Sequence, residues 1–157
     1  MSVCYTTFTI AVRRQQTSQG VCKSISQMYF KDFDNWNIVK KRTHDNELKV
    51  SIRSGEIRWI SCGVNVGSEI DGKGESFTRP ALIVHVVGTV LALVIPLSTK
   101  LKDVAGYIPF EFQGKTTSLC VHQMRIVSQR RILARKGRIS DKRLAEVKSQ
   151  IKKFFDL

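Results

Sequence analysis

The sequence lacks the cysteine patterns that indicate a metal centre or a redox site. Its four cysteines are far apart and include no CxxC pair: Cys4, Cys22, Cys62 and Cys120. We therefore expect no zinc site, no redox motif and no cofactor. This cysteine usage fits a reducing compartment, and no basic region precedes the short apolar stretch near the N-terminus, as it would in a signal peptide. We predict a cytoplasmic protein.

Long hydrophobic runs are also scarce, and residues 81–97 form the one that could be taken for a membrane helix. Its length is at the lower limit for crossing a bilayer, but valine, isoleucine and threonine dominate where a helix prefers leucine and alanine. Arg79 and Lys100 flank the run, so the charge asymmetry that orients a single span is absent. Two buried strands are favoured over a membrane span.

Two residues in the middle of this run, Gly88 and Thr89, predict a hairpin turn. Glycine at the first position of a two-residue loop suits a type II′ turn, which needs a positive φ there. Pro96 is expected to end the second strand.

Acidic residues are few, with 13 Asp and Glu against 26 Lys and Arg, and the formal net charge is +13. Such a field attracts polyanions. The excess is C-terminal, because residues 56–122 hold six basic and six acidic residues, whereas residues 123–157 hold eleven and three. Either a phosphate-contacting surface or a solvated helix face would explain this run. Charge alone does not separate DNA from RNA.

The chain has 157 residues, enough for one domain whose core needs neither disulfides nor a metal. Residues 1–27 are rich in Ser, Thr and Gln and show no sustained periodicity, so we expect a tail with little structure over residues 1–30. One hypothesis is that translation starts at Met28, and a native mass that includes Met1 would contradict it. A helical extension over residues 31–52 and a barrel domain over residues 53–157 are expected to follow.

An amphipathic helix is predicted from Lys31 to about Lys49. Asp32 is a suitable N-cap. Three apolar residues recur three apart among charged neighbours, which keeps them near one face: Phe33, Trp36 and Val39.

Five short strands are predicted after the turn at residues 53–55. In the first, EIRWISC, Ile57 and Trp59 alternate with charged residues. A glycine-rich loop over residues 63–79 is too long for a simple hairpin connection, so we expect it to be functional or mobile. The hairpin supplies two strands, and GYIPFEF and TSLCVHQMRIVS are predicted as the last two.

A final helix is predicted after Ser140, which can cap it. Its apolar residues have helical spacing: Leu144, Val147, Ile151 and Phe154. Strands followed by one terminal helix favour a small, strongly bent antiparallel barrel. The predicted fold class is therefore mainly β (α+β), a small antiparallel barrel with a C-terminal helix and an extra N-terminal amphipathic helix.

Five sequence blocks occur in an order that resembles the PemK/MazF family of toxin endoribonucleases. They are GEIRWI, GSE, RPALIV, VIPLST and HQMRIVSQRRI, across about residues 55–157. Each block alone is common, and the order makes the resemblance specific. It implies a small SH3-like barrel of the PemK/MazF type that dimerises and cleaves single-stranded RNA without a metal. It also implies a cognate antitoxin, whose complex with the toxin binds DNA.

Arg79 is the first candidate site residue. In the family, the arginine before the proline acts on the scissile phosphate, and Arg79 stands at the matching position. A guanidinium is permanently charged and presents a planar fork of donors to phosphate oxygens, which suits a pentacovalent transition state. The alternative is a surface arginine in a loop.

A hydroxyl just after the proline of the following strand is the second candidate. Ser98 matches this position and Thr99 follows it, whereas the family more often has threonine at the first of the two. A hydroxyl can fix a non-bridging phosphate oxygen, although strand ends also carry Ser and Thr for ordinary turn reasons. The choice between Ser98 and Thr99 stays open.

Glu69 matches a carboxylate of the family's first loop. Attack by a 2′-hydroxyl needs a base for its proton and an acid for the leaving 5′-oxygen. Glu69 could be the base, or it could hold Arg79 in place by an ion pair. His122 stands where some relatives carry aspartate, and it could serve as acid or base, although a strand histidine is more often packed or solvated.

Contacts to RNA are expected from four further polar residues: Ser68, Lys100, Gln123 and Arg125. Sequence preference would come from unstacked bases held in loop pockets. The predicted partners are therefore a single-stranded RNA substrate, an antitoxin protein and a second copy of the chain.

Two other functions compete with RNA cleavage. A family with a related barrel poisons DNA gyrase and performs no chemistry, and fold does not fix function. A non-catalytic RNA-binding module would show strongly salt-dependent affinity without cleavage. The Arg-Pro and Pro-x-Ser elements favour cleavage, because binding a protein target would not require them.

Overall fold

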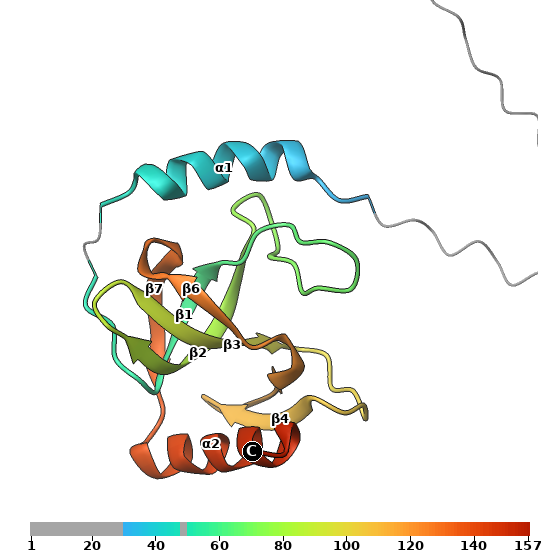
Figure 1. The fold of residues 1–157 in the computed structure, drawn as a ribbon. Coiled ribbons are helices and arrows are strands. Elements are labelled where there is room, and N and C mark those ends of the chain that lie inside the picture. Colours follow the sequence, from blue (N-terminus) through green and yellow to red (C-terminus); the bar gives the residue numbers. More distant parts are fainter. Residues whose placement is uncertain (1–29, 48–49) are drawn as a thin grey trace, which may run out of the picture. The chain divides into compact units, whose positions relative to one another are not determined.

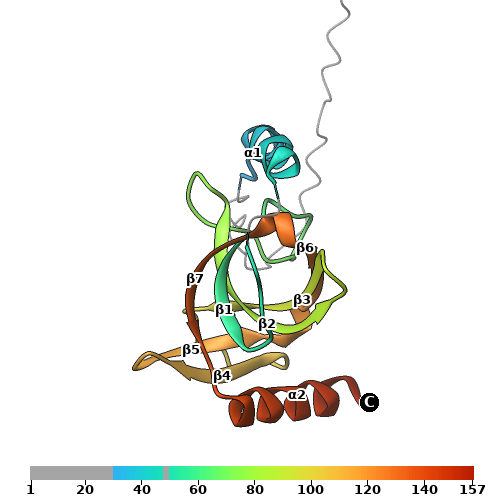
Figure 2. The same cartoon turned by 90° about the vertical axis from the view of Figure 1, so that its left-hand side faces the viewer.

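A computed structural model of the protein describes residues 30–47 and 50–157. The predicted tail lies outside the described residues except for Phe30, and so do residues 48–49 of the predicted helical extension. Two helices, α1 (Phe33–Asp45) and α2 (Asp141–Phe155), lie at opposite ends of the sheet (Figures 1 and 2). The strands are β1 (Glu56–Ser61), β2 (Thr78–Val87), β3 (Leu91–Ser98), β4 (Tyr107–Phe112), β5 (Lys115–Cys120), β6 (Arg125–Ser128) and β7 (Ile132–Arg138).

The described strands form one antiparallel sheet in the order β4-β5-β3-β2-β1-β7, with β6 also paired to β3. The sheet curls strongly (Figure 2). No ladder joins β4 to β7 in the described part of the chain, but the Gln113 side-chain amide donates to the Lys136 carbonyl at 3.1 Å. The predicted fold class is confirmed: the fold is α+β and mainly β, with a barrel-like sheet.

The apolar run over residues 81–97 is a pair of strands, as predicted. β2 and β3 pair antiparallel from Ala81 and Pro96 to Val87 and Leu91. The loop between them has three residues rather than the predicted two, and Gly88 begins it with a φ of +59°. Among the described helices, none is long and apolar enough to cross a membrane.

The prediction that Pro96 ends its strand is wrong, because β3 continues to Ser98. β3 pairs with β6 as far as Val94, and with β5 from Leu97 onward. Pro96 falls between these two ladders and lies opposite Ala81 of β2.

The prediction of a single strand over TSLCVHQMRIVS is also wrong. The segment is divided into β5 and β6 by a short 3-10 helix, η1 (Val121–Gln123), closed by a hydrogen bond from the Met124 N–H to the Val121 carbonyl at 3.0 Å. Both strands pair with β3, at different points along it, so the chain must turn between them. His122 and Gln123 therefore lie on a turn and not on a strand.

β7 was not predicted, because its sequence ILARKGR shows no alternation of apolar and polar residues. It follows a second 3-10 helix, η2 (Gln129–Arg131), and pairs with β1. Most of its side chains are exposed. Pairing with a central strand, rather than burial, determines this strand.

The predicted first strand is present as β1, but its alternation of apolar and charged residues does not match which side chains are buried. Trp59 is 38% exposed, whereas Glu56 and Arg58 are buried. Arg58 Nε donates to Glu56 Oε2 at 2.8 Å, and its other nitrogens donate to the carbonyls of Ser51 and Leu133. Because every polar group of this pair finds a partner, both charges are tolerated inside.

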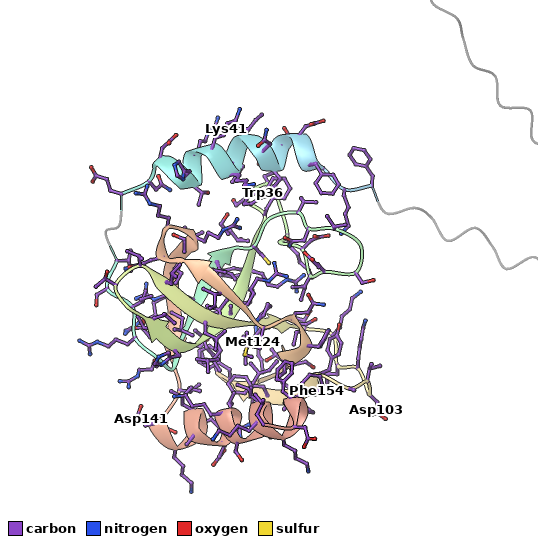
Figure 3. All side chains as sticks on the ribbon, viewed as in Figure 1. Trp36, Lys41, Asp103, Met124, Asp141 and Phe154 are labelled. Carbon is purple, nitrogen blue, oxygen red and sulfur yellow. The ribbon has the colours of Figure 1, made fainter. Side chains whose placement is uncertain are left out.

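The main hydrophobic core lies between the sheet and α2. Ser140 caps α2 by accepting from the Arg143 N–H at 3.2 Å, as predicted. The buried face of α2 consists of Leu144, Val147 and Ile151. Phe154 and Met124 pack against the same core from α2 and from the segment after η1 (Figure 3).

α1 begins as predicted, with the Asp32 carboxylate accepting from the Asn35 N–H at 3.1 Å. It ends at Asp45, earlier than expected. Trp36 is buried on the side that faces the sheet, whereas Lys41 points away from it (Figure 3). Phe33, predicted on the same apolar face, is 48% exposed.

Candidate active site

A cavity of about 510 Å³ opens beside the start of β2 and the end of β3. Both predicted elements of the site reach it, Arg79 from β2 and Ser98 with Thr99 from β3. It is lined further by aromatic and basic side chains from β1, β4, β5, β7 and the loop before β2: Trp59, Phe112, Lys73, Lys115 and Lys136. Four cations beside a hydroxyl pair favour a ligand that carries phosphate.

The register of the hairpin explains why Arg79 and Ser98 meet. Ala81 lies opposite Pro96 in the β2–β3 ladder. Arg79 and Ser98 each lie two residues beyond this last pair, at the same end of the hairpin. Both residues line the cavity, so the hairpin brings the two side chains to one site.

Arg79 is held in a fixed orientation by backbone carbonyls. Its Nε donates to the Asp71 carbonyl at 2.8 Å, and its Nη1 donates to the Leu97 carbonyl at 3.3 Å. Within the described residues, Nη2 makes no hydrogen bond. A guanidinium oriented on one side and unpaired on the other can donate to a phosphate oxygen without first reorganising.

Ser98 is half-buried, and its Oγ accepts from the Lys100 N–H at 3.1 Å. The hydroxyl hydrogen can therefore donate to a ligand. Thr99 and Lys100 are exposed, and the Lys100 carbonyl accepts from buried Ser118 Oγ at 3.1 Å.

The structure does not bring Glu69 or Ser68 to the lining of this cavity. Both are exposed on the loop between β1 and β2. The Glu69 carboxylate makes no hydrogen bond or ion pair within the described residues. The alternative role for Glu69, an ion pair with Arg79, is therefore absent, because carbonyls hold Arg79 instead.

His122 also lies outside the cavity lining. Its Nδ1 is 3.0 Å from the Gly106 carbonyl, and its ring packs on Tyr107 with 4.8 Å between centroids. A Cβ on Gly106 would come within 2.5 Å of this imidazole, so glycine makes the contact possible.

Gln123 and Arg125, predicted to contact RNA, both contact the loop between β1 and β2. Gln123 Oε1 accepts from the Ile70 N–H at 3.1 Å. Arg125 Nη1 donates to Asn65 Oδ1 at 3.4 Å.

The sequence reasoning missed the aromatic and lysine lining. Trp59 faces Lys136, whose Nζ lies 5.7 Å from the ring centroid, in the range of a cation–π contact. A tryptophan next to a charged residue on a strand was a usable signal for Trp59. Lys115 and Lys136 carried none, because their place depends on how distant strands pair.

Two buried cysteines lie near Arg79. Burial raises the pKa of the Cys120 thiol to about 11, although the charges of Arg79 and Lys102 act in the opposite direction. Burial likewise raises the pKa of Cys62. Both are thiols at neutral pH and cannot act as thiolate bases. Among the described residues, no group of three or more His, Cys, Asp or Glu could hold a metal ion.

The fold and the cavity together define a small antiparallel, barrel-like protein with a basic site suited to a phosphate-bearing ligand. Residues 53–155 match the sequence model of the family described as PemK-like, MazF-like toxin of type II toxin-antitoxin system. The match covers more than half of the chain, so this protein belongs to that family of toxins. Membership implies an antitoxin as its partner.

Solved structures agree with the fold. The chain is similar to MazF (Form-I) from Deinococcus radiodurans, with a TM-score of 0.53 and 16% identity over 69% of this chain and 100% of that chain. Toxin MazF-mt6 from Mycobacterium tuberculosis gives a TM-score of 0.48 and 14% identity over 65% of this chain and 97% of that chain, which is too low to add support. No curated protein matches the sequence significantly.

Proposed function

We propose that this toxin is a sequence-selective, metal-independent endoribonuclease that cleaves single-stranded RNA. The observation that carries the proposal is the convergence of Arg79 and Ser98 in one basic cavity. Membership of the MazF-like toxin family supports the same activity.

In the proposed reaction, the 2′-hydroxyl of one nucleotide attacks the adjacent phosphorus and the 5′-oxygen of the next nucleotide leaves. The products are a 2′,3′-cyclic phosphate and a 5′-hydroxyl end. Arg79 stabilises the charge that develops on the phosphoryl oxygens. Ser98, with Thr99 beside it, donates to a non-bridging oxygen and fixes the phosphate for in-line attack.

Glu69 is the proposed base for the 2′-hydroxyl proton. Its exposed carboxylate has no partner within the described residues to compete for that proton. His122 remains the alternative for either proton transfer, although its Nδ1 is engaged with the Gly106 carbonyl. Only Nε2 of that ring would then face substrate.

Binding of the RNA strand is assigned to the aromatic and basic lining. Bases of single-stranded RNA stack on aromatic side chains, which Trp59 and Phe112 supply at this cavity. Lysines contribute a sequence-independent attraction to phosphates. Ser68, Lys100, Gln123 and Arg125 stay proposed contacts for the strand outside the cavity.

The remaining parts of the proposal concern partners. We expect the protein to form a homodimer. We also expect a cognate antitoxin with an acidic segment that folds on binding and covers the site of net positive charge. An mRNA substrate places the activity in the cytoplasm.

The test is cleavage of a long single-stranded RNA in EDTA, with mapping of the 5′-ends. Wild-type protein should give discrete cuts, and Arg79→Ala should lower the rate by roughly 100-fold or more, the usual cost of losing a donor to a transition-state oxyanion. Arg42→Ala is the matched control, because it removes the same charge from an exposed position on α1. No cuts by folded wild-type protein would contradict the proposal and favour a toxin that binds a protein target. Salt-dependent RNA binding without cuts would favour a binding module.

A further inference from the structure

One lysine, just before the N-cap of α1, holds the loop between β1 and β2, residues 62–77. Lys31 Nζ lies 3.2 Å from Asp71 Oδ2, and it also donates to the carbonyls of Asn65 and Gly67. Both charged side chains are largely buried, at 16% exposed for Lys31 and 14% for Asp71. An ammonium has three donors, and here all three have acceptors.

Asp71 links this lysine to Arg79. The Asp71 carbonyl accepts from Arg79 Nε at 2.8 Å, while Asp71 Oδ1 accepts from the Asn65 N–H at 2.6 Å. The side chain of Asp71 is thus fixed from two sides, by Lys31 and by Asn65. Its backbone carbonyl is fixed with it, in the position that orients the Arg79 guanidinium.

Trp36 fastens the base of the same loop to α1. The loop closes with a hydrogen bond from the Gly63 N–H to the Phe77 carbonyl at 3.0 Å. Trp36 contacts both residues, with 5.7 Å between its ring and that of Phe77. At Gly63 the approach is so close that a Cβ would lie 2.5 Å from the indole.

We propose that α1 positions the catalytic arginine and that Lys31 is its positioning residue, acting through Asp71 on Arg79. The inference rests on the proposed ribonuclease function, since it concerns how Arg79 meets the RNA phosphate. α1 lies outside residues 53–155, which match the family model. The orientation of Arg79 in this chain therefore depends on a segment beyond the matched domain.

The first readout follows Arg79 itself and needs no activity. In ¹⁵N-labelled full-length protein, the Nε–Hε signal of Arg79, assigned with Arg79→Lys, reports its hydrogen bond to Asp71. Lys31→Met should shift this signal and speed its hydrogen exchange by roughly tenfold, as expected for loss of a fixed acceptor. Lys41→Met is the matched control, because it removes the same charge from the outward side of α1 (Figure 3) and should leave the signal in place.

The second readout is the kinetics of RNA cleavage. Lys31→Met should lower kcat by roughly tenfold with KM changed less than about twofold, because a misplaced group weakens the transition state more than the bound substrate. Lys31→Arg keeps a cation beside Asp71 and should recover most of kcat. A loss of charge that only weakened RNA binding would raise KM, and Lys41→Met would do the same.

Three outcomes would overturn the inference for folded Lys31→Met: an unchanged Arg79 signal, a shifted signal with unchanged kcat, or a loss equalled by Lys41→Met. If wild-type protein cleaves no RNA, the proposed function fails. The signal of Arg79 still decides whether Lys31 orients it.

Discussion

The two helices of this toxin are alike in sequence pattern and different in what they contact. Each begins with a side-chain cap and carries apolar residues at helical spacing. α2 buries three apolar residues against the main core, whereas α1 buries Trp36 alone among the described residues. α1 instead contacts the loop whose carbonyl orients Arg79.

The two helices therefore have different roles: α2 stabilises the fold, and α1 positions the site. Apolar area removed from water is the largest favourable contribution to folding, and α2 supplies it to the sheet. α1 buries little apolar area. The polar contacts of Lys31, just before α1, are all made with one loop. Damage to α2 should therefore unfold the protein, and damage to α1 should alter the site of a protein that stays folded.

The largest effect on stability is expected from α2. Ile151→Ala should lower the free energy of unfolding by about 2 to 5 kcal/mol, the usual cost of truncating a buried isoleucine. Urea denaturation measures this, and Lys152→Ala, exposed on the same helix, should stay within about 0.5 kcal/mol of wild type. If Ile151→Ala lowers the free energy of unfolding no more than Lys152→Ala does, the stabilising role assigned to α2 is contradicted.

A smaller, pH-dependent effect is expected where the chain passes from α1 into β1. Burial alone would raise the pKa of Glu56, but hydrogen bonds from Arg58 and from the Arg53 N–H, with the charges of Arg58 and Arg135, hold it below its ordinary 4.5. A lowered pKa means that the ionised carboxylate stabilises the fold above pH 4.5 and that this contribution is lost as the pH falls through the folded-state pKa.

Glu56→Gln should therefore lower the free energy of unfolding at pH 7 by about 1 to 3 kcal/mol, the range for a hydrogen bond to a charged group. The difference in free energy of unfolding between Glu56→Gln and wild type, measured by urea denaturation, should be smaller near pH 3. Glu146→Gln removes a carboxylate from an exposed pair on α2 and should change little at either pH. If this difference grew toward low pH, it would contradict the conclusion that ionised Glu56 stabilises the fold.

The smallest effect is expected at the contact of α1 with the loop. Gly63→Ala places a methyl group 2.5 Å from Trp36, whereas Gly67→Ala meets open space at a similarly positive φ. Both variants bear the strain of that φ, roughly 1 to 2 kcal/mol, so their difference isolates the clash. Amide hydrogen exchange should speed up in α1 only for Gly63→Ala. Equal exchange in both variants would show that Trp36 does not fasten α1.

The elements that local patterns determine could be predicted from the sequence. Caps and helical spacing predicted both helices, and Gly88 between two β-branched runs predicted the hairpin. That hairpin in turn brings Arg79 and Ser98 to the same end of two paired strands, so the centre of the candidate site followed from a short stretch of sequence. Two details of the hairpin were wrong, the length of its loop and the end of its second strand at Pro96.

The rest depends on pairing between distant strands. β7 has no apolar alternation, and its place beside β1 brings Lys136 over Trp59. The break of the predicted fifth strand at η1 reflects two separate ladders on β3. Burial of Glu56 and Arg58 likewise required partners from residues far along the chain, such as the Leu133 carbonyl. The residues in these contacts are far apart along the chain, so no short stretch of sequence contains both partners.

The most direct test of the central claim uses one RNA with and without the attacking hydroxyl. After the cuts are mapped, a short RNA that contains one cleavage site is compared with the same strand carrying a single 2′-deoxynucleotide just before the scissile phosphate. Wild-type protein in EDTA should cleave the first to a cyclic phosphate and a 5′-hydroxyl end, bind both strands alike, and leave the second intact. Cleavage of the deoxy-substituted strand at an undiminished rate would contradict attack by the 2′-hydroxyl in the Arg79 and Ser98 cavity.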